Sequence, residues 1–422
     1  MPETTAISTS AATETALADR YALVRAVTRE LAAPLSAEDA VAQSMPEASP
    51  VKWHLAHTTW FFEHFVLGHR GIDAVHPEWH RLFNSYYRSA GTFHARHARG
   101  LLTRPSLDEV LRWRGEVDAR IDALLRRADG DADVAMRVTL GINHEQQHQE
   151  LLLTDVKHLL WCNPLRPAYR ELPNPCRSSG MLPPLRFLDG DSGVVEIGAS
   201  ENGFAYDNER PRHRVLLSDY AIADRLVSNA EFRDFIEDGG YRTPLLWMSE
   251  GWDVVEREGW RHPLYWSEDC ATEFTLSGMK DIDPQAPVCH LSHFEADAFA
   301  RWAGARLPRE EEWEAFAARH GNAGQGNLLD RGALHPLAAE AGAMQLFGDV
   351  WEWTASPYVG YPGFRALEGS LGEYNGKFMS SQMVLRGGSC VTPCGHVRAS
   401  YRNFFAPGAR WQFSGLRLAR DA

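Results

Sequence analysis

The hydrophobic residues in the first part of the chain recur at the spacing of amphipathic helices. Residues 16–33 are the clearest case, because one helical face carries the apolar side chains Leu17, Tyr21, Val24, Val27 and Leu31. The same period continues in three later stretches, residues 50–68, 106–128 and 132–160. Four helices of this length predict an up-and-down helical bundle over residues 15–162. Residues 1–14 lack this pattern and predict a disordered lead-in.

The pattern changes at residues 163–185, where prolines are frequent and no helical period is present. This composition predicts an interdomain linker. Residues 186–422 then show short strand-like runs, many turns and two short helical patterns near residues 229–238 and 293–303. The sequence therefore predicts an α+β protein with two domains, a helical one followed by a mixed one with long loops.

Composition narrows the classes of partner. The formal net charge is −13, with 43 Lys and Arg against 56 Asp and Glu and no basic cluster, which argues against binding to nucleic acid or anionic membranes. No run approaches the roughly 18 apolar residues that a membrane helix needs. The N-terminus has neither a basic start nor an apolar stretch, so we expect a cytoplasmic protein.

The sharpest local signal is the motif His144-Glu145-Gln146-Gln147-His148-Gln149-Glu150. Histidines four residues apart lie on one helix face, so both imidazoles can reach one metal ion. His57, on another helix of the predicted bundle, is the natural third ligand, since bundles build metal sites from facing helices. His54, one turn earlier, is expected to have a structural or supporting role.

The same letters, His144-Glu145-x-x-His148, also match the zinc-peptidase motif, in which the glutamate is the general base. No convincing third ligand of such a peptidase follows downstream, and the large second domain would have no explanation. Three imidazoles suit Fe(II) oxygen chemistry as well as zinc hydrolysis, so the motif alone does not choose between them.

The second domain carries several blocks in one order. They are EIGAS, DNERPRHRV and VSNAEFRDFIEDGGY within residues 196–241, then a long helical block over 287–317, FGDVWEWTASPY at 347–358 and RGGS at 386–389. Together these blocks resemble the formylglycine-generating-enzyme, or sulfatase-modifying-factor, fold, a variant of the C-type lectin architecture. Copper oxidases of that family use a cysteine pair after RGGS. Here Cys390 and Cys394 have a different spacing, which favours two ordinary thiols.

The first domain resembles the DinB-like four-helix bundles, whose metal motif H-x3-H-x-E fits His144, His148 and Glu150. A DinB-like bundle followed by a formylglycine-enzyme-like domain is the architecture of the ergothioneine and ovothiol sulfoxide synthases. The resemblance implies that Fe(II) is bound by His57, His144 and His148. Glu150 lies off the face of the two helix histidines, which implies a supporting role for it.

The resemblance also implies the substrates and the residues that bind them. The substrates are hercynine (trimethylated histidine), a thiol and O2. Gln147 matches the position that hydrogen-bonds the hercynine imidazole, and Asn403, followed by Phe404, matches a residue near its betaine end. The quaternary ammonium group favours aromatic partners. Arg96 and Arg99 match paired arginines that hold the thiol substrate's carboxylate.

Three further residues refine the expected reaction. Tyr86 and Tyr87 resemble the tyrosine pair of the cysteine-using branch, and a phenol there can deliver a proton during oxygen reduction. Family members that take γ-glutamylcysteine have an acidic residue where this chain has Phe405. We therefore expect a smaller thiol, such as free cysteine, and hercynylcysteine sulfoxide as the product.

Other readings of the sequence stay open. A selenoneine synthase, which joins a selenosugar to hercynine, shares this architecture. An ovothiol-type synthase usually carries an additional methyltransferase domain, which this sequence lacks. A non-catalytic binding module is a further alternative, since lectin-like domains often serve only recognition.

Overall fold

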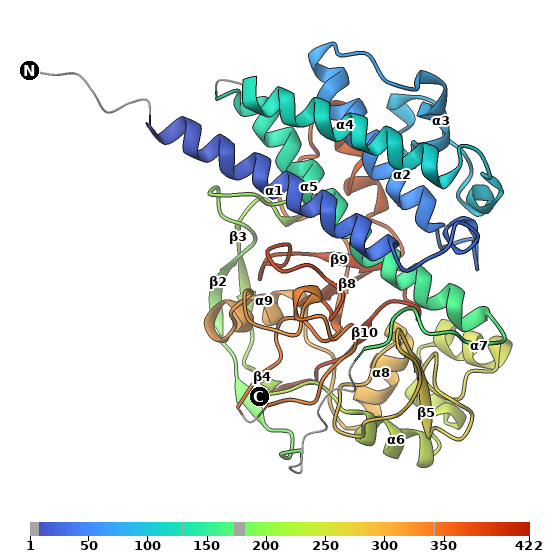
Figure 1. Ribbon diagram of the computed structural model, residues 1–422. Coiled ribbons are helices and arrows are strands. Elements are labelled where there is room, and N and C mark those ends of the chain that lie inside the picture. The colour runs from blue at the N-terminus through green and yellow to red at the C-terminus, as the bar shows by residue number, and fades with distance from the viewer. Residues whose placement is uncertain (1–7, 128–129, 173–181, 341) are drawn as a thin grey trace, which may run out of the picture. The chain divides into compact units, whose positions relative to one another are not determined.

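The structure is a computed structural model that describes residues 8–127, 130–172, 182–340 and 342–422 (Figure 1). The chain divides into two compact units, Met1–Cys162 with Gly369–Leu371 and Asn163–Glu368 with Gly372–Ala422. Part of the linker predicted over residues 163–185 lies outside the described residues. Among the helices of the described residues, none is both long enough and apolar enough to cross a membrane.

The first unit is helical. Its helices are α1 (Ser8–Ala32), α2 (Val51–Phe62), α3 (His80–Phe83), α4 (Leu107–Arg127) and α5 (Ala132–Cys162). The four long helices agree with the four predicted from hydrophobic spacing. Helix α1 begins at Ser8, inside the stretch 1–14 for which the sequence predicts a disordered lead-in, and that lead-in stays a prediction.

The long helices form a bundle whose packing differs from a simple up-and-down arrangement. Helices α1 and α2 each pack along both α4 and α5, as contacts between these elements show. In an up-and-down bundle each helix instead packs beside its neighbours in the sequence. The long connection of residues 63–106 between α2 and α4 allows this different order. It also carries the α3 segment beside α2.

The second unit is built from short strands and short helices. Its helices are α6 (Asn229–Glu237), α7 (Ser249–Glu258), α8 (His293–Trp302) and α9 (Glu310–His320). A capping box begins α6, where the hydroxyl of Ser228 accepts the backbone N–H of Glu231 and the carboxylate of Glu231 accepts that of Ser228. The helices predicted near residues 229–238 and 293–303 are therefore confirmed as α6 and α8.

The strands of the second unit form small sheets. One has the order β1 (Phe187–Asp189), β4 (Tyr220–Ala223), β11 (Ala419–Asp421), and another has β10 (Ser414–Gly415), β7 (Trp351–Pro357), β8 (Met383–Arg386), β9 (Asn403–Phe405). The hairpins β2 (Gly193–Ile197) with β3 (His213–Leu217) and β5 (Thr272–Thr275) with β6 (Gly278–Asp281) complete them. Trp313 and Phe316 of α9 belong to the core cluster, together with Ile222 of β4.

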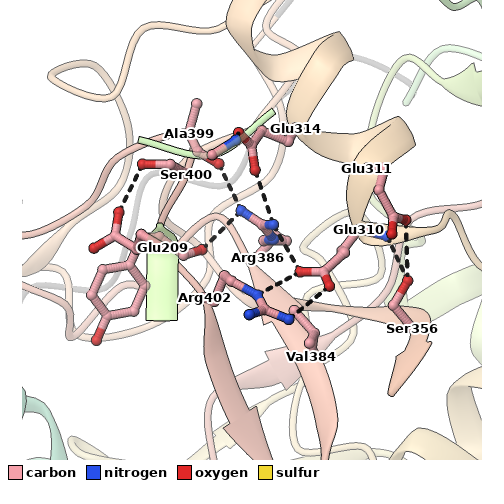
Figure 2. A network of polar contacts seen from close by, with 12 residues as sticks. Glu209, Glu310, Glu311, Glu314, Ser356, Val384, Arg386, Ala399, Ser400 and Arg402 are labelled. Carbon is pink, nitrogen blue, oxygen red and sulfur yellow. Dashed lines mark hydrogen bonds and ion pairs between the residues drawn. The ribbon is translucent and has the colours of Figure 1, made fainter. Parts of the chain in front are cut away.

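A buried ion-pair network fixes the edge strand β9. The carboxylate of Glu310, at the start of α9, accepts hydrogen bonds from Nε and Nη2 of Arg402, each at 2.8 Å, and one from Nη2 of Arg386 at 2.8 Å. Figure 2 shows Glu310 with these two arginines. Because Arg402 directly precedes Asn403, the network anchors the strand that carries Asn403, Phe404 and Phe405.

Candidate metal centre

Three histidines from two helices converge in the first unit. Helix α2 carries His57, and α5 carries His144 and His148 four residues apart on one face. One ring nitrogen from each lies within 4.8 Å of those of the other two. The Nε2 atoms of His57 and His144 are 3.2 Å apart, a separation that two nitrogens bound about 2.1 Å from one metal ion can have.

The environment keeps these imidazoles neutral. Burial is the main cause that lowers the pKa of His57, His144 and His148 well below the usual histidine value, and neighbouring positive groups lower it further. His57 donates its Nδ1–H to the carbonyl oxygen of Phe83 at 2.6 Å, which leaves the Nε2 lone pair facing the other two histidines. Neutral imidazoles are the form of histidine that binds a metal ion.

The donor set fits a transition metal. Among the described residues, His57, His144 and His148 are the one group of three or more metal-ligating side chains that converges in this way. Imidazole nitrogens suit zinc, copper, iron and nickel, so the geometry supports a metal site without naming its metal.

Aromatic rings stack on two of the three histidines. The indole of Trp53 stacks on His57 with ring centroids 4.5 Å apart, and Trp60 stacks on the same imidazole at 5.5 Å. Phe61 stacks on His144 at 4.2 Å. Because Trp53, His57 and Trp60 have helical spacing on α2, their rings lie on one face of this helix and stack on one another.

The carboxylate of Glu145 is bound by other side chains and not by the three histidines. Its carboxylate accepts from Arg25 at 2.8 Å, from Thr28 at 2.6 Å and from Arg114. Burial disfavours its charged form, but Arg114 and Arg25 outweigh that cost and hold the pKa of Glu145 below the usual value. A zinc peptidase needs this glutamate as a base beside the metal, so the contacts argue against that alternative.

The two arginines predicted to bind a carboxylate lie in different environments. Arg99 is 4% exposed, whereas Arg96 is exposed. Arg99 donates to the Ser49 hydroxyl at 2.8 Å, and its guanidinium carbon lies 3.4 Å from the ring centre of Trp53. Among the described residues, no carboxylate lies within ion-pair distance of Arg99, and its Nε has no hydrogen-bond acceptor. A buried cation left in this state is suited to an anionic ligand.

The two tyrosines of the predicted pair also differ in their burial. Tyr87 is fully buried among aromatic rings, with its ring centre 5.7 Å from Trp60 and 5.1 Å from Phe65. Tyr86 stacks on Tyr87 at 4.6 Å but is only half-buried. Burial is the main cause that lowers the pKa of Arg99, followed by Arg96, whereas Asp155 and then Tyr86 act electrostatically in the opposite direction. Tyr86 is therefore the more accessible tyrosine of the pair, while Tyr87 packs in the core.

Two residues beside the ligands have different exposures. Gln147 is half-buried, whereas every other residue from Leu140 to Glu150 is buried. Its position one residue before His148 puts an amide at the accessible side of α5. Glu150 is buried, and the resemblance to DinB-like motifs remains the ground for its predicted supporting role.

The remaining predicted site residues belong to the second unit. Asn403, Phe404 and Phe405 form β9 and are half-buried. The Phe404 ring stacks on Tyr358 at 4.0 Å, with an interplanar angle of 10°. Cys390 is buried and Cys394 is exposed.

Sequence reasoning missed Asp155, one of the residues that support His148. The imidazole of His54 lies between His148 and Asp155, and the backbone N–H of Ser49 donates to Asp155. Asp155 follows His148 by seven residues, which is two helical turns, so its place on the same face of α5 was a usable signal. His54 was expected only in a structural or supporting role.

Comparison with known proteins agrees with both domains. The DinB superfamily model matches residues 20–158, and the model of the sulfatase-modifying factor enzyme 1-like domain matches residues 190–336 and 332–422. A hercynine oxygenase from Mycolicibacterium smegmatis is 34% identical, over 96% of this chain and 98% of its own length. The chain belongs to the hercynine oxygenase family.

Other relatives fit this assignment. The hercynine oxygenase from Mycobacterium tuberculosis is 33% identical, covering 89% of this chain and 92% of its own. A formylglycine-generating enzyme from Streptomyces coelicolor is 29% identical, covering 59% of this chain and 91% of its own. The similarity to hercynine oxygenases thus spans both units, which confirms the predicted family and the predicted combination of folds.

Proposed function

We propose that this protein is a hercynine oxygenase that uses Fe(II) and O2 to join a thiol sulfur to C2 of the hercynine imidazole. The observation that carries the proposal is the convergence of three buried, neutral imidazoles, His57, His144 and His148, within a chain of this family. When bound, Fe(II) would supply the redox chemistry that activates dioxygen, with coordination positions left for the substrates.

The overall reaction balances without a further reductant. The imidazole C2–H bond and the S–H bond of the thiol break, and a C–S bond forms. One oxygen atom of O2 enters the product as the sulfoxide, and the other leaves as water with the two hydrogens. The two substrates supply all four electrons that O2 accepts, and the product with cysteine is hercynylcysteine sulfoxide.

The chain's own residues have distinct roles in this proposal. Arg99 binds the carboxylate of the thiol substrate, because a buried guanidinium without an ion-pair partner gains most from an anion. Arg96 adds a weaker, solvent-screened attraction. Tyr86, the half-buried member of the tyrosine pair, is the proton donor.

Hercynine is the ligand for a second group of residues. The amide of Gln147, on the accessible side of α5, hydrogen-bonds its imidazole. Asn403 and Phe404 bind its betaine end, where the trimethylammonium group offers no hydrogen bond and favours an aromatic face. Phe405 leaves no acidic anchor for a γ-glutamyl group, which favours free cysteine as the thiol.

The test is oxygen uptake by protein that has been loaded anaerobically with Fe(II). The protein is given hercynine with cysteine, with γ-glutamylcysteine or with a selenosugar, and the product is identified by mass. We expect uptake and a sulfoxide with cysteine. Uptake with the selenosugar alone would instead establish the selenoneine synthase alternative. No uptake with any pair, despite bound iron, would contradict the proposed substrates.

A further inference from the structure

The imidazole of His54 links a proposed metal ligand to a buried carboxylate. Its Nδ1 lies 2.8 Å from Nδ1 of His148, and its Nε2 lies 3.1 Å from Oδ2 of Asp155. All three side chains are at most 9% exposed. His54 comes from α2, and the other two come from α5, so the contact spans the same helix pair as the metal centre.

For a neutral His54 imidazole, one arrangement of protons satisfies both contacts. A carboxylate accepts hydrogen bonds, so His54 donates from Nε2 to Asp155. A neutral imidazole has only one N–H, and Nδ1 of His54 is then an acceptor. The proton in the 2.8 Å contact therefore belongs to Nδ1 of His148. This leaves Nε2 of His148 with the lone pair that a metal ion requires.

We propose that His54 and Asp155 form a positioning relay that sets the tautomer and ring orientation of His148, an inference that rests on the metal-binding function proposed above. His57 reaches the same state by a shorter route, since its Nδ1–H donates directly to the Phe83 carbonyl. The side chains of His54 and Asp155 orient His148, whereas a single backbone carbonyl orients His57. Its metal-binding form therefore depends on residues that can be substituted.

The relay extends to the proposed carboxylate-binding arginine. Oδ2 of Asp155 also accepts the backbone N–H of Ser49 at 2.7 Å, and the hydroxyl of Ser49 accepts from Arg99 at 2.8 Å. One carboxylate oxygen thus anchors both the segment that holds Arg99 and the imidazole that orients His148. Loss of Asp155 should therefore weaken metal binding and thiol binding together, whereas loss of His54 should act mainly on the metal.

The experiment measures metal affinity directly, by titrating the full-length apoprotein with Co(II) in competition with a chromophoric chelator. We expect His54→Leu and Asp155→Ala to bind Co(II) about 10–100-fold more weakly than the unmodified chain and to change the Co(II) absorption bands. His54→Asn should recover most of the affinity, because its side-chain oxygen can still accept the Nδ1–H of His148.

Asp118→Ala is the matched control. Asp118 accepts two hydrogen bonds, from Tyr21 at 2.7 Å and Arg25 at 2.6 Å, in the same bundle but away from the relay. It should lower the stability to urea and leave Co(II) affinity unchanged.

The outcomes separate the two proposals. Equal Co(II) affinity for folded His54→Leu, His54→Asn and the unmodified chain would overturn the relay while leaving the metal site in place. If the folded, unmodified chain bound neither Co(II) nor Fe(II), the proposed function would fail and the relay with it. If His54→Leu does not fold, His54→Asn is compared with His54→Gln. The relay predicts weaker Co(II) binding by His54→Gln, since the longer amide places its oxygen away from the position of Nδ1, and equal binding would contradict it.

Discussion

A pair of buried arginines and a single buried arginine in the same helical unit have opposite surroundings. Arg25 and Arg114 converge on the carboxylate of Glu145, and Arg25 also pairs with Asp118 at 2.6 Å. Arg99 is buried as well, but its contacts are the Ser49 hydroxyl and the Trp53 ring. The first cluster is neutralised within the fold and serves its structure. Arg99 has no ion-pair partner among the described residues, and its burial costs stability unless a ligand supplies the opposite charge.

The largest expected effect is on the neutralised cluster. Glu145→Ala leaves two buried guanidinium groups without their carboxylate, and we expect it to lower the free energy of unfolding by about 3–5 kcal/mol. Urea unfolding followed by the helical circular dichroism signal measures this. Glu145→Gln keeps the hydrogen-bond acceptor without the charge and should cost less. A loss below about 1 kcal/mol for Glu145→Ala would mean that the arginines are neutralised elsewhere.

In contrast to Glu145→Ala, Arg99→Ala should weaken substrate binding without lowering stability. We expect the KM for cysteine to rise about 10–150-fold, because each hydrogen bond to a charged group contributes about 1.5–3 kcal/mol. The urea midpoint should not fall, since the substitution removes an uncompensated buried charge. Steady-state oxygen uptake at varied cysteine measures the KM. Arg114→Ala is the control and should lower stability instead. An unchanged KM in Arg99→Ala would remove the proposed carboxylate site.

The difference between these arginines could not be seen in the sequence. Spacing on a helix predicts that His144 and His148 share a face, and the motif blocks predict both domains, because these depend on local periodicity and on order along the chain. Neutralisation of a charge depends on partners far apart in the sequence. Glu145 looked like a candidate base within the motif until its contacts with Arg25 and Arg114 were known.

The contact of Asp155 with His54 was hidden for the same reason. Asp155 has the helical spacing of the ligands, but only the approach of α2 to α5 places His54 between it and His148. Likewise, two neighbouring tyrosines are equivalent in the sequence, and burial alone separates Tyr87 in the core from the half-buried Tyr86. Tertiary packing, which local patterns do not encode, decides these roles.

A smaller effect is expected from adding a charge instead of removing one. Phe405→Asp introduces the acidic residue that the family resemblance leads us to expect in enzymes that use γ-glutamylcysteine, and its carboxylate can attract the ammonium group of the γ-glutamyl moiety. Because Phe405 is half-buried on the edge strand β9, the fold should tolerate the change. We expect the ratio of kcat/KM for γ-glutamylcysteine to that for cysteine to rise about tenfold, worth about 1.4 kcal/mol. Phe405→Asn introduces a side chain with the shape of aspartate but no charge, and it should leave this kcat/KM ratio near its starting value.

The smallest effect should come from Arg96, the exposed neighbour of Arg99. An ion pair in water contributes at most about 1 kcal/mol, so Arg96→Ala should raise the KM for cysteine by less than about fivefold. Raising the ionic strength shortens the screening length from about 10 Å at 0.1 M to about 3 Å at 1 M, and this should abolish the effect of Arg96→Ala. The loss in Arg99→Ala should persist at high salt, because burial shields that site from mobile ions. If salt abolished both effects equally, Arg99 would bind its ligand in open solvent, and the contrast between the buried arginines would not bear on function.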